Sequence, residues 1–132
     1  MSAHATGSMG LKTWEEQPYS EIDGGPKLTR ADVITAFRGE IEGEGTKAYL
    51  MVYHDDASAS FVGLERVVGR VGDRAGSFVV QHSGTFEGGT ARATVSVVPG
   101  SGTGDLRGLR GEGSYVWPHG QSGAITLDYD FE

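Results

Sequence analysis

The hydrophobic side chains of this chain recur with a period of two along most of its length. Near the end, polar residues separate four inward-facing candidates, Ile125, Leu127, Tyr129 and Phe131. Such alternation is typical of β-strands that bury one face, and no window of a dozen residues keeps the three- and four-residue spacing of an amphipathic helix. We therefore predict an all-β fold.

Glycine and the turn signals refine this prediction. The 132 residues include 22 glycines, about twice the usual share, and they lie among β-branched and aromatic residues, as at tight turns and bent strands. Short turns join consecutive strands into a meander, which leaves two exposed edges unless it closes. We predict one domain over residues 1–132, a closed eight-stranded antiparallel meander barrel with strands at 4–14, 29–42, 46–54, 58–71, 76–86, 90–98, 111–117 and 123–131.

The hairpin between the fourth and fifth strands predicts which face is buried. A turn at Asp73-Arg74 places Glu65 opposite His82 on a face that is otherwise apolar. The alternative that pairs Glu65 with Val80 and Arg66 with Val79 is disfavoured on both faces. The same face of these two strands carries Phe61, Val67, Phe78 and Val80. Alternation in the last strand directs Tyr129 inward, and we expect Tyr115 of the seventh strand to reach the interior as well. We take these six residues as ligand-binding candidates.

The following hairpin supports the same interior. A turn at Gly88-Gly89 puts small and β-branched residues on the His82 face, namely Ala91, Ala93, Val95 and Val97. An eight-stranded barrel is just wide enough to be filled by side chains or to hold one small ligand. The inward glycines and alanines favour a cavity. A two-residue turn after the third strand would direct Tyr49 and Tyr53 outward.

Glu65 and His82 are the candidate catalytic residues. A carboxylate beside an imidazole in an apolar interior tunes the histidine for general acid or base catalysis. The alternative is a buried structural pair, in which case Glu65→Gln should cost little stability because a neutral amide still pairs with a neutral histidine. Tyr115 and Tyr129 would either donate to a developing oxyanion or serve as core rings with hydroxyls at the rim.

Composition and motif spacing exclude several function classes. A net charge of −7 repels nucleic acid, and no apolar run approaches a membrane span. Cysteine is absent and no secretory signal is visible, so we expect a cytoplasmic protein. The histidine spacing lacks metal-site patterns, although His54, His82 and Glu65 from separate strands form a less favoured metal set. The 100–104 glycine loop lacks a P-loop lysine, so we expect neither metal nor cofactor.

Several blocks of sequence in order resemble a bacterial family known as domain of unknown function 3224. The blocks are 4–7, 14–19, 25–30, 41–45, 61–66, 76–84, 99–104 and 109–111, of which FVGLER, GSFVVQHSG and PGSGTG are the strongest. That family resembles the allene oxide cyclase barrel, which implies a closed eight-stranded meander. Proteins of that shape steer cyclisation or coupling of reactive small molecules, but no motif transfers their catalytic residues to this chain.

Three functions are compatible with these patterns. The first is a barrel that binds a small apolar or aromatic molecule, with isomerisation or cyclisation by Glu65 and His82 as its catalytic form. The second is a non-catalytic carrier on the same barrel. The third is an interaction module that acts as a homo-oligomer. An open interior with a polar floor favours the first two, and a filled interior favours the third.

Overall fold

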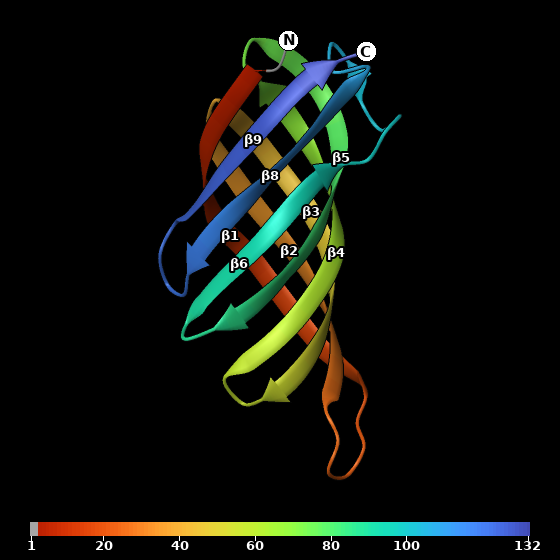
Figure 1. The fold of residues 1–132 in the computed structure, drawn as a ribbon, viewed down its shortest axis with the longest axis vertical. Helices are drawn as coiled ribbons and strands as arrows, with labels where there is room; N and C mark the ends of the chain where they lie inside the picture. Colours follow the sequence, from red (N-terminus) through yellow and green to blue (C-terminus); the bar gives the residue numbers. More distant parts are fainter. Residues whose placement is uncertain (1–2) are drawn as a thin grey trace.

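The computed structural model describes residues 3–132, which form nine strands and no helix. Figure 1 shows the strands wrapped around a common axis, with residue 3 and the C-terminus near one end of the molecule. No helix in this part of the chain could cross a membrane. The strands are β1 (Ala3–Ser20), β2 (Lys27–Gly39), β3 (Ile41–Asp55), β4 (Ser58–Val71), β5 (Arg74–Glu87), β6 (Thr90–Val97), β7 (Thr103–Gly104), β8 (Leu109–Pro118) and β9 (Gly123–Phe131).

Eight of these strands form a ring in which every pairing is antiparallel. The order is β1-β2-β3-β4-β5-β6-β8-β9, and β9 pairs with β1. The two-residue β7 pairs only with β5, outside this order. The all-β prediction is confirmed. The first strand is longer than expected, and β1 and β2 extend as a hairpin arm beyond the other strands, at the bottom of Figure 1.

The interior of the ring is apolar because alternate residues of each strand face it. In β4, for example, Phe61, Val67 and Val71 are buried while Val62, Leu64 and Val68 between them are exposed. The predicted inward residues of β6 and β9 follow the same rule, since Val95, Val97, Ile125 and Leu127 are buried. Burial of this apolar face is the main stabilising contribution to such a fold.

The register of the β4–β5 hairpin differs from the prediction. Val71 pairs with Arg74, so the turn is Gly72-Asp73, and Glu65 lies opposite Val80 rather than His82. Gly72 has φ of +62°, as the first central residue of a type II′ hairpin turn requires, and only glycine adopts it without strain. The shift is two residues, so both side chains keep the predicted face, and Glu65 becomes the diagonal neighbour of His82.

The predicted outward direction of Tyr49 and Tyr53 is wrong. The β3–β4 pairing shifts by one residue between Tyr53 and Asp55, where a bulge interrupts the ladder. Relative to the register that a two-residue turn alone would set, this one-residue shift moves the β3 side chains on the far side of the bulge from the turn to the opposite face. Tyr49 is therefore buried and Tyr53 is half-buried against the core.

Candidate functional site

The interior of the ring contains a buried acid and a buried base in contact. Glu65 on β4 and His82 on β5 are 1% and 0% exposed, and the carboxylate Oε1 lies 2.9 Å from the imidazole Nε2. The predicted contact is thus present, although it arises from a diagonal pair rather than from directly opposed residues. Because an ionised carboxylate can only accept, this contact requires the tautomer in which Nε2–H donates to Glu65.

Two tyrosines extend this pair into a chain of hydrogen bonds. The Tyr115 hydroxyl lies 3.3 Å from His82 Nδ1 and 2.7 Å from the Tyr49 hydroxyl. Since Nε2 of a neutral imidazole carries the proton here, Nδ1 is an acceptor, so Tyr115 donates to it and Tyr49 donates to Tyr115. Protons therefore align from Tyr49 through Tyr115 and His82 to Glu65.

A buried lysine, not anticipated from the sequence, completes the cluster. Lys47 on β3 is 3% exposed, and its Nζ lies 3.9 Å from Glu65 Oε2. Three aromatic rings surround the amine, with centroids at 5.0 Å for Tyr49, 5.2 Å for Trp117 and 5.8 Å for Tyr115. Within residues 3–132, neither Lys47 Nζ nor Glu65 Oε2 has a hydrogen-bond partner.

Burial shifts the pKa values of these groups in the directions that favour neutral forms. Loss of hydration lowers the pKa of Lys47 against the opposing charge of Glu65, and it lowers the pKa of His82 against the Glu65 hydrogen bond. Burial also raises the pKa of Tyr49 and of Tyr115. A neutral imidazole and a lysine with a lowered pKa are the forms needed for acid–base and nucleophilic chemistry.

Glycines make the space that the carboxylate and one ring occupy. A methyl group at Gly45 would overlap Glu65 Oε2, and one at Gly63 would approach the Tyr49 ring. The absent side chains let a charged group sit between strands without displacing the backbone. These two glycines therefore position Glu65 and Tyr49, whose side chains fill the space that was expected to remain as a cavity.

The six predicted ligand-binding residues all face the interior, but they do not form one site. Tyr115 contacts His82, and the ring of Phe61 lies edge-on to Tyr49 at 4.9 Å. Val80 is paired with Glu65, while Val67 pairs with Phe78 one step further along. Tyr129 packs with Phe131 at 6.0 Å and lies near the β4–β5 turn. It is therefore not part of the cluster.

Two partly exposed tryptophans connect the cluster with the surface. Trp14 is 43% exposed and its ring lies 6.1 Å from that of Tyr49. Trp117, which is half-buried, covers Lys47 and donates from Nε1 to the Gln121 carbonyl at 2.7 Å. Trp117 is therefore in contact both with the buried amine and with the β8–β9 turn at the surface.

A polar pocket of about 530 Å³ lies beside the β1–β2 hairpin arm. At its edge the Glu16 carboxylate accepts hydrogen bonds from Trp14 Nε1 at 3.0 Å, from Thr29 Oγ1 at 2.7 Å and from the Tyr53 hydroxyl. Burial and the Glu16 hydrogen bond raise the pKa of Tyr53 to about 12. Lys27 lies 5.0 Å from the centroid of the Tyr53 ring. The polar groups at this edge of the pocket are thus already paired by hydrogen bonds, and they lie next to the partly exposed Trp14.

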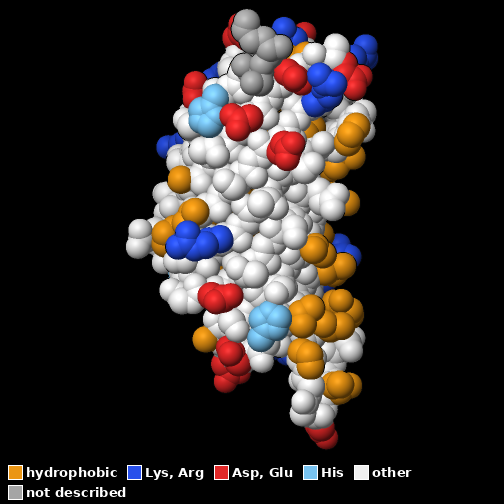
Figure 2. Space-filling model, viewed as in Figure 1, with side chains coloured by type: hydrophobic (Ala, Val, Ile, Leu, Met, Phe, Trp, Pro, Cys, Tyr) orange, Lys and Arg blue, Asp and Glu red, His pale blue; other side chains and the backbone are white. Residues whose placement is uncertain are grey.

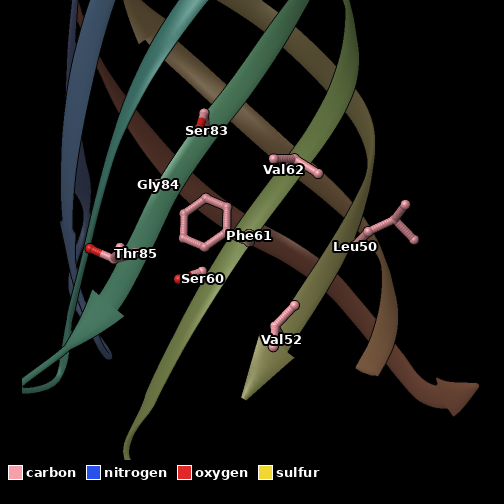
Figure 3. A pocket seen from close by; sticks show the side chains of 8 residues that line it. All are labelled: Leu50, Val52, Ser60, Phe61, Val62, Ser83, Gly84 and Thr85. Atoms are coloured by element: carbon pink, nitrogen blue, oxygen red, sulfur yellow. The ribbon is translucent and has the colours of Figure 1, made fainter. Parts of the chain in front are cut away.

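A shallower pocket of about 350 Å³ lies over β3, β4 and β5 (Figure 3). Most of its lining residues belong to the outward-facing set, namely Leu50, Val52, Ser60, Val62, Ser83 and Thr85. Hydrophobic side chains gather along the right-hand edge of the space-filling view (Figure 2). This surface is separate from the buried cluster, because alternate residues of one strand face opposite sides.

The less favoured metal set is not assembled. His54 is exposed and its Nε2 lies 2.8 Å from Ser60 Oγ, whereas His82 is buried against Glu65. No group of three metal-ligating side chains occurs in the part of the chain that the structure describes. The acid–base cluster is therefore the site with the strongest chemical character.

The sequence contains a signal for Lys47 that the predicted faces missed. Gly43, Gly45, Lys47, Tyr49 and Met51 alternate along β3 and share one face of the strand. The bulge near Tyr53 turns that face inward. The β2–β3 pairing gives the same face, because Lys47 lies opposite the buried Val33, so either hairpin could have indicated that this lysine is buried.

Comparison with known proteins assigns the chain to a family. The model of a family described as a protein of unknown function, DUF3224, matches residues 5–129. The chain belongs to the DUF3224 family. A DUF3224 protein of unknown function from Shewanella oneidensis MR-1, solved by crystallography, is 30% identical with a TM-score of 0.81, and the match covers 100% of this chain and 99% of that one. No curated protein matches the chain. Membership of this family confirms the predicted resemblance, and the function of the family is unknown.

Proposed function

We propose that this DUF3224 protein binds a small apolar or aromatic molecule within the ring and that Glu65 and His82 act on it as an acid–base pair. The observation that carries the proposal is the buried polar cluster, in which Lys47 Nζ and Glu65 Oε2 lie 3.9 Å apart and have no hydrogen-bond partner among the described residues. Unsatisfied buried polar groups are costly. A ligand with one polar group would satisfy both atoms.

The surroundings of the cluster suit a ligand with a ring or a conjugated chain. Tyr49, Phe61, Tyr115 and Trp117 present aromatic surface around the polar atoms. Aromatic rings supply contact area, and a few fixed polar groups determine orientation. We place the entrance at the hairpin end, where Trp14 and Trp117 are partly exposed.

The hydrogen-bonded chain gives the pair a defined role in an isomerisation or cyclisation. Glu65 Oε2 is free to accept a proton from a carbon or hydroxyl of the ligand, and His82 holds the other carboxylate oxygen in place. Tyr115 donates toward His82 and would redirect its hydroxyl to a developing oxyanion. We also propose that the ring is a closed barrel of the allene oxide cyclase type, and the ring of eight paired strands supports this assignment.

Fluorescence titration tests the proposal, because Trp14 and Trp117 border the proposed entrance. We would titrate hydrophobic carbonyl and phenolic compounds between pH 5 and 8, using wild type, Lys47→Met and Glu65→Gln. We expect saturable binding that both variants weaken by roughly tenfold, because each removes one of the two polar atoms that would hold the ligand. Leu64→Ser, on the outer face of β4, is the matched control and should bind like wild type. Binding that the interior variants leave unchanged would place the ligand elsewhere and refute the site.

The outer face of β3 and β4 supports a second candidate function, self-association. Leu50, Val62, Leu64 and Val68 are 47%, 50%, 55% and 59% exposed, and Leu50 pairs directly with Val62. A contiguous exposed apolar patch is typical of an interface. We propose that a second copy covers it. Sedimentation equilibrium should show an oligomer that Leu64→Glu dissociates, and a wild-type monomer at high concentration would exclude this function.

A further inference from the structure

Lys47 is the group of the cluster whose position the acid–base proposal does not explain. Its Nζ has no hydrogen-bond partner in residues 3–132, and its side chain is 1% exposed. Glu65 faces it at 3.9 Å but bonds to His82 through the other oxygen. A lysine buried only for packing would direct its ammonium toward solvent, yet this amine points into an aromatic cage.

We propose that Lys47 is a nucleophilic amine that captures a small aromatic or conjugated aldehyde or ketone as an imine. The inference deepens the proposed function, on which it rests, by naming the ligand class and the atom that reacts. Aromatic rings lie on three sides of the amine at 5.0–5.8 Å. They would stack against the ring or chain of the carbonyl compound while its carbonyl carbon meets Nζ.

Glu65 supplies the proton transfers that imine formation needs. The lysine nitrogen attacks the carbonyl carbon, which forms the C–N bond and leaves the electron pair on oxygen. Glu65 Oε2 takes one proton from the nitrogen and delivers it to that oxygen, which gives a carbinolamine. It then carries the second nitrogen proton to the hydroxyl group, which leaves as water while the C=N bond forms. The net reaction consumes one amine and one carbonyl, produces one imine and one water, and involves no oxidation.

The environment also keeps the amine reactive. Desolvation lowers the pKa of Lys47, whereas an exposed lysine with a pKa near 10.4 is neutral in only about one molecule in a thousand at pH 7.4. Trp117 covers the amine and is tied to the β8–β9 turn by one hydrogen bond to the Gln121 carbonyl. Displacement of that ring would expose the face of the amine that the ring covers.

Reductive trapping tests the inference with the native protein. Benzaldehyde and sodium cyanoborohydride would be added at pH 7.4, and benzylated lysines located by peptide mass mapping. Lys12, which forms an exposed ion pair with Glu44, and Lys27, which lies over Tyr53, are internal comparators. We expect Lys47 to react at least about tenfold faster than Lys12, because its neutral form is more populated. In urea the preference should disappear, which controls for detection of each peptide.

The outcomes separate this inference from the proposed function. Lys47→Met and Lys47→Arg should both abolish the preferred adduct, and the wild-type map decides the matter even if a variant fails to fold. Benzyl alcohol has the same ring without a carbonyl and serves as the non-covalent probe in a fluorescence titration. Binding of benzyl alcohol beside labelling of only Lys12 and Lys27 would overturn the imine and leave the proposed function standing. Failure of both probes to bind would overturn the proposed function itself.

Discussion

Replacing Glu65 with glutamine should destabilise the protein far more than a neutral structural pair would. The amide oxygen still accepts from His82, and on that ground the sequence alone predicts a small cost. Lys47 changes this expectation, because the substitution removes the only carboxylate within 4 Å of its buried Nζ among the described residues. Breaking a buried ion pair by removing one partner costs about 3–5 kcal/mol.

The cost has an upper bound, since Lys47 can release its proton instead of staying charged. At pH 7, neutralising a lysine with an unfolded pKa near 10.4 costs about 4.6 kcal/mol, at 1.36 kcal/mol per unit. Part of that cost is already present in the wild type, where burial lowers the pKa of Lys47. We therefore expect Glu65→Gln to lower the free energy of unfolding by about 2–4 kcal/mol at pH 7.

Urea unfolding at pH 7 and pH 9 measures this loss. The variant's lysine has a folded pKa below its unfolded value, so the unfolded state binds more protons and stability rises with pH. At pH 9 the upper bound on the loss of unfolding free energy falls to about 1.9 kcal/mol. Adding Lys47→Met to Glu65→Gln should return stability to within about 1 kcal/mol of wild type, because both charges are then gone.

Glu42→Gln is the matched control, because Glu42 forms an exposed ion pair with Arg70. It should change stability by less than about 1 kcal/mol. A Glu65→Gln loss as small as the control, or one that Lys47→Met does not relieve, would refute the reasoning that Lys47 depends on Glu65.

Three further predictions concern the same cluster. Burial lowers the pKa of His82, so the free energy of unfolding should fall as pH drops below about 6.5, by up to about 1.36 kcal/mol per pH unit. Urea unfolding of His82→Gln over the same pH range should lack this dependence on pH. An equal pH dependence in the variant would show that other groups cause it. Gly45→Ala should cost at least about 2 kcal/mol, because a methyl group there overlaps the buried carboxylate, whereas Gly10→Ala, with open space around it, should be tolerated in the same thermal melts. Tyr115→Phe leaves the Tyr49 hydroxyl and the His82 imidazole without a partner and should lower the free energy of unfolding by about 1–3 kcal/mol. Tyr19→Phe, at an exposed position, should leave stability unchanged. Equal melting temperatures for Tyr115→Phe and wild type would contradict the proposed chain of hydrogen bonds.

The strand class and the buried face of most strands followed from the sequence. Period-two alternation depends only on the geometry of a single strand, so Ile125 and Leu127 were correctly placed inside. The Gly88-Gly89 turn was also correct, because both glycines have positive φ and define a two-residue hairpin without reference to the rest of the chain. Glu65 and His82 were predicted to share the buried face for the same reason, because a register error of two residues leaves each side chain on the same face of its strand.

Only the tertiary structure decided the composition of the cluster. The two-residue shift at Gly72 and the one-residue shift after Tyr53 are small backbone choices, and the packing of whole strands selects between them. The second shift agrees with the β2–β3 pairing, in which Lys47 lies opposite the buried Val33, and both pairings place Tyr49 and Lys47 in the interior. Alternation with Tyr49 and Met51 indicates the strand face on which Lys47 lies, but no local signal shows that its burial is tolerated. The cost of that burial depends on a carboxylate and aromatic rings that strands distant in sequence bring together. The sequence by itself therefore determined an acid and a base on one face, and the closing of strands around them determined that an amine shares their site.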